Sequence, residues 1–169
     1  MEKKARGFEK ISFNQFKKDL NFINNIEEAY NNIMMPVRAT SNSVGYDICT
    51  PFDFIIKPSE IKLIPTGLKV YFNSDEMFAL YVRSSMGFKY NIRLCNQVGI
   101  FECDYYNNEQ NEGHIFVKIQ NEGNKDVEFH AGDRIVQGIF SKYLIIDNDN
   151  ASGIRIGGIG STGEGDVNG

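Results

Sequence analysis

Two carboxylates, Glu102 and Asp104, lie two residues apart in an apolar segment that we expect to be a strand. Because successive side chains of a strand point to opposite faces, both carboxylates are expected on one face. Paired carboxylates beside phosphate groups can activate a water molecule or hold a magnesium ion. This pair therefore favours chemistry on a phosphorylated substrate.

Two further segments carry groups that suit an anion. Residues 83–87 read RSSMG at the end of an apolar run, and they offer a guanidinium, two hydroxyls and a glycine that admits close approach of the backbone. Residues 132–138 read GDRIVQG, which is typical of a turn leading into a strand, with polar Gln137 among apolar neighbours. A hairpin turn held by an Asp–Arg pair explains this second segment equally well.

The C-terminal segment 148–169 is polar and rich in glycine, with too few apolar residues to join a core. We expect it to be disordered or to be ordered by a ligand. Residues 158–163 match the dinucleotide pattern GxGxxG, but that pattern must follow a strand and open a helix, and only six residues remain after it. Backbone N–H groups and hydroxyls of this segment can still surround a phosphate, with Arg155 beside them. A solvated tail without a ligand is the simpler alternative.

These segments need a scaffold, and the 169 residues are enough for one domain. After Pro36 the chain consists of short runs rich in β-branched and aromatic residues, separated by clusters of Pro, Gly, Asn and Asp. Many short strands at regular spacing indicate a β-sandwich or a barrel. No further long helix is expected after this proline.

The N-terminal segment has a different period. Its apolar residues fall three and four apart, which places them on one face of a helix from about residue 13 to 33. Ser12 followed by Gln15 has the form of a capping box, and Pro36 lies where the helix should stop. The apolar face is expected to pack on the domain or on a neighbouring subunit, and a helix dedicated to a partner is the alternative.

Charge and composition exclude several classes. The net charge of −4 and the absence of long basic runs argue against nucleic acid as a partner. No apolar run approaches the length of a membrane span, and no apolar region follows the basic N-terminus as in a secretory signal. The three cysteines, without a CxxC pattern, indicate reduced thiols in the cytoplasm.

Five segments, taken in order, resemble the five motifs of the trimeric dUTP pyrophosphatases (dUTPases). They read GYD at 45–47, RSSxG at 83–87, NxVGxxxxDY at 96–105, GDRIxQ at 132–137 and GGxGSTG at 157–163. The resemblance implies an all-β jelly-roll barrel at 36–147, after an N-terminal helical extension (1–35) and before a flexible Gly-rich C-terminal arm (148–169). It also implies a homotrimer with shared active sites, and hydrolysis of dUTP to dUMP and pyrophosphate with Mg²⁺.

The resemblance also suggests roles for individual residues. Glu102 and Asp104 are the catalytic carboxylates, with the first activating the water that attacks the α-phosphate. Asp47 reaches the metal only through water. The phosphate ligands are Arg83, Ser84, Ser85, Gly87, Gln137, Arg155, Gly160, Ser161 and Thr162. The uracil and deoxyribose contacts are Asn96, Gly99, Tyr105 and Ile159.

The chain departs from the family pattern at four places, one of which is an Arg155-to-Ile159 spacing one residue shorter than in many members. Glu102 stands where an aspartate is usual. Three alternatives follow: Glu102 serves as the base, the chain binds dUTP with weak turnover, or Asp104 acts as the base instead. Ile159 stands where an aromatic residue usually stacks on uracil. A longer loop is expected at 106–113.

Two other functions compete with hydrolysis of dUTP. A dUTP-binding regulatory protein with a protein partner fits Glu102 and the N-terminal helix. A dCTP deaminase shares the fold family, but Tyr105 and the sequence GGIGSTG follow the dUTPase pattern.

Overall fold

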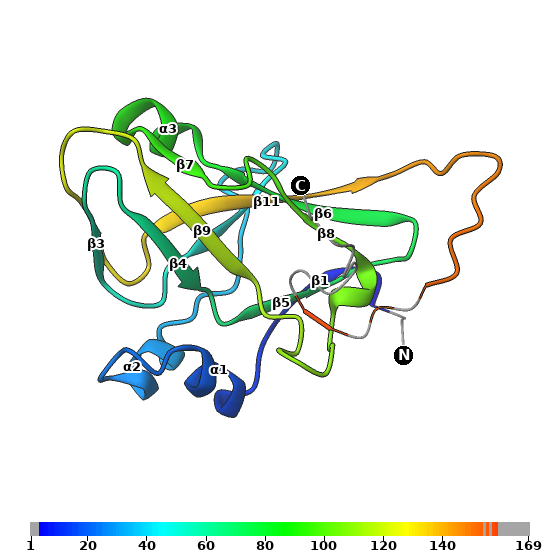
Figure 1. Ribbon diagram of the computed structural model, residues 1–169, viewed down its shortest axis with the longest axis horizontal. Helices are drawn as coiled ribbons and strands as arrows, with labels where there is room; N and C mark the ends of the chain where they lie inside the picture. Colours follow the sequence, from blue (N-terminus) through cyan, green and yellow to red (C-terminus); the bar gives the residue numbers. More distant parts are fainter. Residues whose placement is uncertain (1–3, 154, 156, 159–169) are drawn as a thin grey trace, which may run out of the picture.

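A computed structural model describes residues 4–153, 155, 157 and 158 of the chain, and most of its regular structure is antiparallel strand (Figure 1). The N-terminal part contains β1 (Gly7–Lys10), α1 (Phe13–Asp19) and α2 (Ile26–Asn31). Then follow β2 (Tyr46–Cys49), β3 (Phe54–Ile56), β4 (Ile61–Pro65), β5 (Leu68–Tyr71), β6 (Glu76–Val82), α3 (Ser84–Tyr90), β7 (Ile92–Leu94), β8 (Gly99–Phe101), η1 (a 3₁₀ turn, Cys103–Tyr105), β9 (Phe116–Asn121), β10 (Val127–Phe129) and β11 (Arg134–Lys142).

Among the described residues, the strands form four small sheets in which all pairs are antiparallel. The largest has the order β2-β11-β6-β8, and a second has the order β4-β9-β7. Two-stranded sheets pair β1 with β5 and β3 with β10. The expectation of a mostly β chain after Pro36 is therefore confirmed.

The centre of the largest sheet depends on a glycine. A Cβ atom on Gly138 of β11 would lie 2.0 Å from the ring of Phe78, so only glycine leaves room for this ring under the strand. Phe78 is fully buried and contacts the rings of Phe8, Phe101 and Phe140 at centroid distances of 4.9–5.9 Å. This aromatic cluster holds together the two central strands that carry the candidate site.

The N-terminal segment forms two short helices, so the prediction of one continuous helix over 13–33 is wrong. Half of the predicted capping box is present, because Ser12 Oγ accepts a hydrogen bond from Gln15 N–H at 3.2 Å. The other half is not formed, since Ser12 N–H donates to Glu112 and the Gln15 side chain contacts Asp19. The helix ends at Leu20, whose backbone leaves helical geometry (φ −114°, ψ 40°). The asparagines at 21, 24 and 25 favour this break, since asparagine has a low helix propensity.

The apolar face of the N-terminal segment nevertheless packs on the domain, as the first of the two expectations stated. Phe16, Leu20 and Ile33 are buried in the common hydrophobic core. The turn between β4 and β5 meets this face closely, because a Cβ atom on Gly67 would lie 2.3 Å from Ile33. Across the described residues, no helix is long and apolar enough to cross a bilayer.

Candidate active site

The two catalytic candidates lie just beyond the end of β8. Glu102 continues the strand in extended geometry, whereas Asp104 lies in the 3₁₀ turn. The prediction that both residues occupy one strand is therefore wrong, since the strand ends at Phe101. Both carboxylates still converge, because Arg155 Nη2 donates to Glu102 Oε2 at 2.8 Å and Arg155 Nε donates to Asp104 Oδ1 at 2.9 Å.

Arg155 forms this bridge from a nearly buried position, with 8% of its side chain exposed, while both carboxylates are more than half exposed. Its guanidinium also lies over the ring of Tyr105, 5.7 Å from the ring centroid. The resemblance places Arg155 on the γ-phosphate of another subunit's site. In this structure the same guanidinium instead pairs with the two candidate carboxylates, Glu102 and Asp104, of its own chain.

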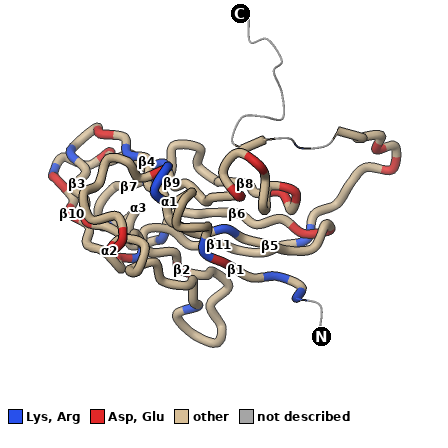
Figure 2. Tube along the Cα trace, turned by 90° about the horizontal axis from the view of Figure 1, so that it is seen from below, with Lys and Arg blue, Asp and Glu red and all other residues tan. Residues whose placement is uncertain are grey.

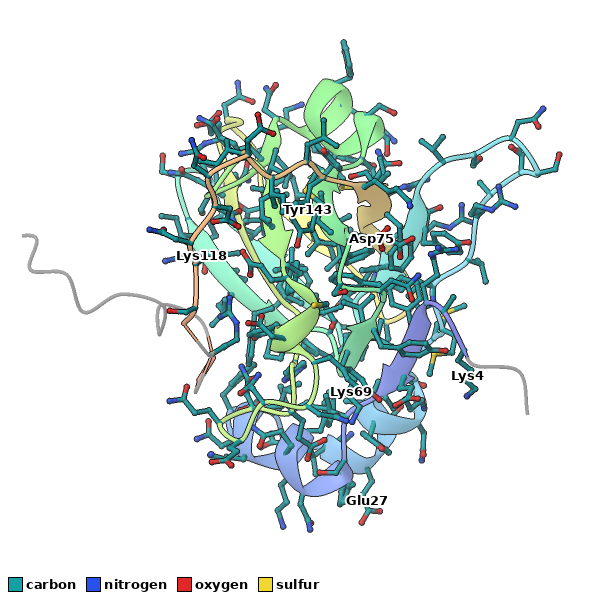
Figure 3. The ribbon with its side chains drawn as sticks, turned by 90° about the vertical axis from the view of Figure 1, so that its right-hand side faces the viewer. Lys4, Glu27, Lys69, Asp75, Lys118 and Tyr143 are labelled. Atoms are coloured by element: carbon teal, nitrogen blue, oxygen red, sulfur yellow. The ribbon has the colours of Figure 1, made fainter. Side chains whose placement is uncertain are left out.

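A cavity of about 560 Å³ opens beside Glu102. It brings together five of the predicted residues, which are Asn96, Gly99, Glu102, Tyr105 and Arg155. Apolar walls come from Leu63, Leu80 and Phe116, so a flat base or a sugar could bind there with a few polar groups to orient it. Lys118 of β9, labelled in Figure 3, also lines the cavity and was missed by the sequence reasoning.

Tyr105 is held firmly in the floor of this cavity. Only 5% of the residue is exposed, and its hydroxyl donates to the backbone carbonyl of His114 at 2.9 Å while accepting from Asn111 Nδ2 at 2.9 Å. Burial raises the pKa of the Tyr105 phenol, so this hydroxyl stays protonated and keeps its role as a donor. A neutral, fixed ring suits packing against a sugar better than acid–base chemistry.

A second cluster forms around Asp47 of β2, which is 7% exposed. Arg83 Nε lies 2.8 Å from Asp47 Oδ1, and Arg134 Nη1 donates to Asp47 Oδ2 at 3.3 Å. Gln137 of β11 pairs with Asp47 across the sheet, so both side chains point to the same face. The cluster therefore joins three of the five motifs on one surface.

Arg134 belongs to this cluster and was missed as a site residue. The sequence suggested an Asp–Arg pair within the 132–138 turn, but Arg134 turns to Asp47 instead. Asp133 Oδ2 accepts from the backbone N–H of His130 at 2.8 Å and so closes its own turn. The only signal for Arg134 was its place inside the GDRI motif.

The remaining phosphate candidates lie next to Arg83 or outside the described residues. Ser84 and Ser85 are exposed in the first turn of α3, and a Cβ atom on Gly87 would find no heavy atom within 4 Å. Ligand atoms could therefore approach this turn freely. Ile159, Gly160, Ser161 and Thr162 lie outside the described residues.

The two clusters are far apart on one chain. Phe101 pairs with Phe78 near the start of β6, so Glu102 lies at that end, whereas Arg83 follows the last residue of β6. At about 3.3 Å per residue, the two ends of the strand are separated by roughly 20 Å. One chain alone therefore does not bring Arg83 and Glu102 to the same phosphate group.

The C-terminal arm meets the loop that follows β8. Gly158 N–H donates to Gln110 Oε1 at 2.7 Å, and a Cβ atom on Gly157 would lie 2.7 Å from the same side chain. Figure 2 shows acidic positions beside β8 at this loop. Within the part of the chain that is described, no three Asp, Glu, His or Cys side chains gather into a metal-binding group.

Comparison with known proteins identifies the family of the chain. A sequence model of the dUTPase family matches residues 31–164. The deoxyuridine 5'-triphosphate nucleotidohydrolase of Lactococcus lactis is 44% identical over 133 residues, which span 78% of this chain and 89% of the relative. The crystal structure of a dUTPase from Streptococcus mutans is 37% identical, with a TM-score of 0.67 over 83% of this chain and 98% of that one.

A more distant structure shares the fold alone. The dUTPase of phage phi11 of S. aureus, described with a structural Mg(II) ion, is 15% identical with a TM-score of 0.65 and covers 89% of this chain and 98% of its own. Membership of the family is shown instead by the match over residues 31–164 and by the 44% identity to the Lactococcus enzyme. The chain belongs to the dUTPase family.

Proposed function

We propose that this protein hydrolyses dUTP to dUMP and pyrophosphate, with Glu102 as the base that activates the attacking water. The observation that carries the proposal is the convergence of Glu102 and Asp104 at a cavity that also contains Asn96 and Tyr105, in a chain of this family. In the reaction, the water oxygen bonds to the α-phosphorus while its proton passes to Glu102. The bond from that phosphorus to the bridging oxygen breaks, and pyrophosphate leaves.

The other groups position the nucleotide. Asn96 and the backbone near Gly99 would read the edge of uracil together with Ile159, and Tyr105 would pack under the deoxyribose. The phosphates would be held by Arg83, Ser84, Ser85, Gly87 and Gln137, and by Arg155, Gly160, Ser161 and Thr162 of the arm. Arg155 Nη2 donates to Glu102 Oε2, so the guanidinium would have to move away before this oxygen can accept the proton of the attacking water.

Magnesium would neutralise charge on the phosphates. Both oxygens of Asp47 already face arginines, so this carboxylate fits a role through water and not as a direct ligand. Magnesium usually keeps several waters and binds phosphates, which agrees with a site that lacks an all-protein cage among the described residues.

We also propose that the protein is a homotrimer whose sites are shared between subunits. The roughly 20 Å that separate Arg83 from Glu102 along β6 leave each chain with an incomplete site. After β11 an extended segment leaves the body of the domain (Figure 1), and its residues Leu144, Ile145 and Ile146 are 96, 69 and 74% exposed. Apolar side chains exposed to this extent are typical of a surface that another chain covers.

Membership of the dUTPase family also supports a proposal for the barrel, the N-terminal segment and the C-terminal arm. We propose closure of the sheets into a jelly-roll barrel over 36–147, with the segment 1–35 as an extension and 148–169 as an arm that closes on bound nucleotide. A cytoplasmic location agrees with a substrate from the nucleotide pool.

Mixing two inactive variants tests the shared site and the activity together. Arg83→Ala and Glu102→Gln are each expected to be inactive on dUTP. After the two are mixed and their subunits exchange, about one quarter of the sites should receive an intact Arg83 from one chain and an intact Glu102 from another, if association is random. Pyrophosphate release should therefore return to about a quarter of the wild-type value.

The wild-type protein provides the reference in this assay, and dCTP provides the second substrate. Ammonia release from dCTP would identify a deaminase instead. No recovery in the mixture, with both variants folded and able to exchange subunits, would mean that the site does not combine Arg83 and Glu102 from different chains.

A second candidate function is a dUTP-binding regulatory protein with weak turnover. It is favoured by the ion pair between Arg155 and Glu102, which occupies the catalytic carboxylate. The activity of the wild-type protein separates the two functions.

A further inference from the structure

Helix α1 is attached at both ends to the loop that carries Tyr105, which we call the site loop (residues 105–114). At its start, Glu112 accepts a hydrogen bond from Ser12 N–H at 2.8 Å and from Ser12 Oγ at 2.5 Å. At its end, Asp19 Oδ2 lies 2.6 Å from His114 Nδ1. The N-cap and the last residue of α1 therefore both contact the site loop.

Additional contacts extend this attachment to β1 and β5. Tyr106 Oη donates to Glu9 Oε2 of β1 at 2.6 Å. Lys69 of β5, labelled in Figure 3, donates to Asn107 Oδ1 at 2.7 Å. The site loop is thus bonded to the N-terminal segment at three separate residues, namely Tyr106, Glu112 and His114.

The buried imidazole of His114 is the innermost of these contacts. It is 0% exposed, and its Nε2 accepts a hydrogen bond from Gly67 N–H at 2.8 Å. Because Nε2 is an acceptor, the proton of the neutral ring lies on Nδ1 and is donated to Asp19. Burial lowers the pKa of His114, and the hydrogen bond and charge of Asp19 oppose this without cancelling it.

The carboxylate of Asp19 is suited to accept the hydrogen bond from His114 Nδ1–H. Partial burial alone would raise the pKa of Asp19, but hydrogen bonds from His114 and Gln15 outweigh it and leave the pKa below that of an ordinary aspartate. Gln15 Nε2 contacts both carboxylate oxygens at 3.0 Å, which fixes their orientation. A neutral donor therefore faces a charged, oriented acceptor.

The same residue fixes Tyr105 through its backbone. The carbonyl of His114 accepts the hydroxyl of Tyr105 at 2.9 Å, so the position of residue 114 sets the position of the ring in the cavity floor. A continuous path thus leads from Asp19 through the imidazole and the carbonyl of His114 to Tyr105. Asp19 lies outside residues 31–164, the part that matches the dUTPase family model.

We propose that Asp19 and His114 are positioning residues that hold Tyr105 against the bound nucleotide, so that helix α1 contributes to the binding and sugar selectivity of the site. This inference rests on the proposed role of Tyr105 under the deoxyribose. It assigns the N-terminal extension a function within the nucleotide site of its own chain.

Two substitutions at Asp19 provide the test. Asp19→Ala removes the acceptor for His114 Nδ1–H, and we expect its Kd and KM for dUTP to rise about three- to tenfold, the size of one lost hydrogen bond. The preference for dUTP over UTP should fall by a similar factor. Asp19→Asn keeps an acceptor oxygen, and we expect it to restore values close to those of the wild type.

A stability control separates positioning from general destabilisation. Ile56→Val shortens a fully buried side chain of β3 that does not line the cavity, so it should lower the melting temperature without changing KM or the preference for dUTP. Affinities for dUTP and UTP by calorimetry, at a temperature well below melting, complement the kinetics. They measure selectivity even in a protein with little turnover.

The outcomes are distinct. If Asp19→Ala lowers only the melting temperature and keeps the wild-type affinity and selectivity, the inference is wrong while the proposed function stands. A rise in KM for Ile56→Val as large as that for Asp19→Ala would also overturn it. If the wild-type protein neither binds nor hydrolyses dUTP, both the proposed function and the inference fail.

Discussion

Replacing Glu102 with glutamine is expected to lower the turnover of dUTP by about a thousandfold, within the range for loss of a general base. Glutamine has nearly the shape of glutamate but cannot accept the proton of the attacking water. The cavity contacts of Asn96 and Tyr105 remain, so dUTP should still bind. Single-turnover kinetics and calorimetry with dUTP separate the two effects.

Asp104→Asn is the matched control for this variant. Asp104 contacts Arg155 as Glu102 does, but it lies two residues further along, in the 3₁₀ turn. We expect a smaller loss of turnover for Asp104→Asn than for Glu102→Gln. The opposite order would identify Asp104 as the base, which is the third possibility that the sequence left open.

Replacing Arg83 with alanine is expected to reduce kcat/KM for dUTP by at least about a hundredfold and to weaken the fold as well. The guanidinium is the only fork-shaped donor in the RSSMG segment, and such donors bind phosphate in two places at once. Its loss also leaves the buried carboxylate of Asp47 with a single arginine, Arg134, at 3.3 Å. Loss of a hydrogen bond to a charged group destabilises a protein by about 1.5–3 kcal/mol.

Two controls test the assignment of Arg83. Arg83→Lys keeps a positive charge without the fork, so we expect partial recovery of stability and a smaller recovery of activity. Arg93→Ala removes an arginine that contacts Glu122 and Gln120 and lines neither the Glu102 cavity nor the cavity beside Arg83. It should keep wild-type activity. A phosphate role for Arg83 would be contradicted by an Arg83→Ala variant with lowered stability and an unchanged kcat/KM for dUTP.

The sequence could predict features that depend on neighbours along the chain. The switch from helical to strand periodicity at Pro36 and the cap at Ser12 are local patterns, and both agree with the structure. One cavity contains four predicted residues because all of them lie in or close to the short strand β8. They are Asn96, Gly99, Glu102 and Tyr105. A single continuous motif, residues 96–105, contains all four of them, so the sequence alone was enough to group them.

The contacts that the sequence could not predict join distant residues. Arg134 reaches Asp47 from 87 positions away, and Arg155 reaches Glu102 from 53. His114 is a buried histidine whose partner lies 95 positions earlier, and no spacing rule connects the two. The break after Leu20 was missed because the apolar period continues across it, whereas the asparagines that follow have a low helix propensity.

The central claim is that glutamate at position 102 supports hydrolysis of dUTP, and the most direct measurement is pyrophosphate release by the wild-type protein beside Glu102→Asp. A shift of about 1 Å at a catalytic group can change a rate roughly a hundredfold, so the comparison is sensitive to where the backbone places this carboxylate. We predict an active wild type and a Glu102→Asp variant with equal or lower turnover, because the loop after β8 is adjusted to the longer side chain. An almost inactive wild type that gains about tenfold or more from Glu102→Asp would contradict the account. That result would identify a dUTP-binding protein whose catalytic geometry has been lost.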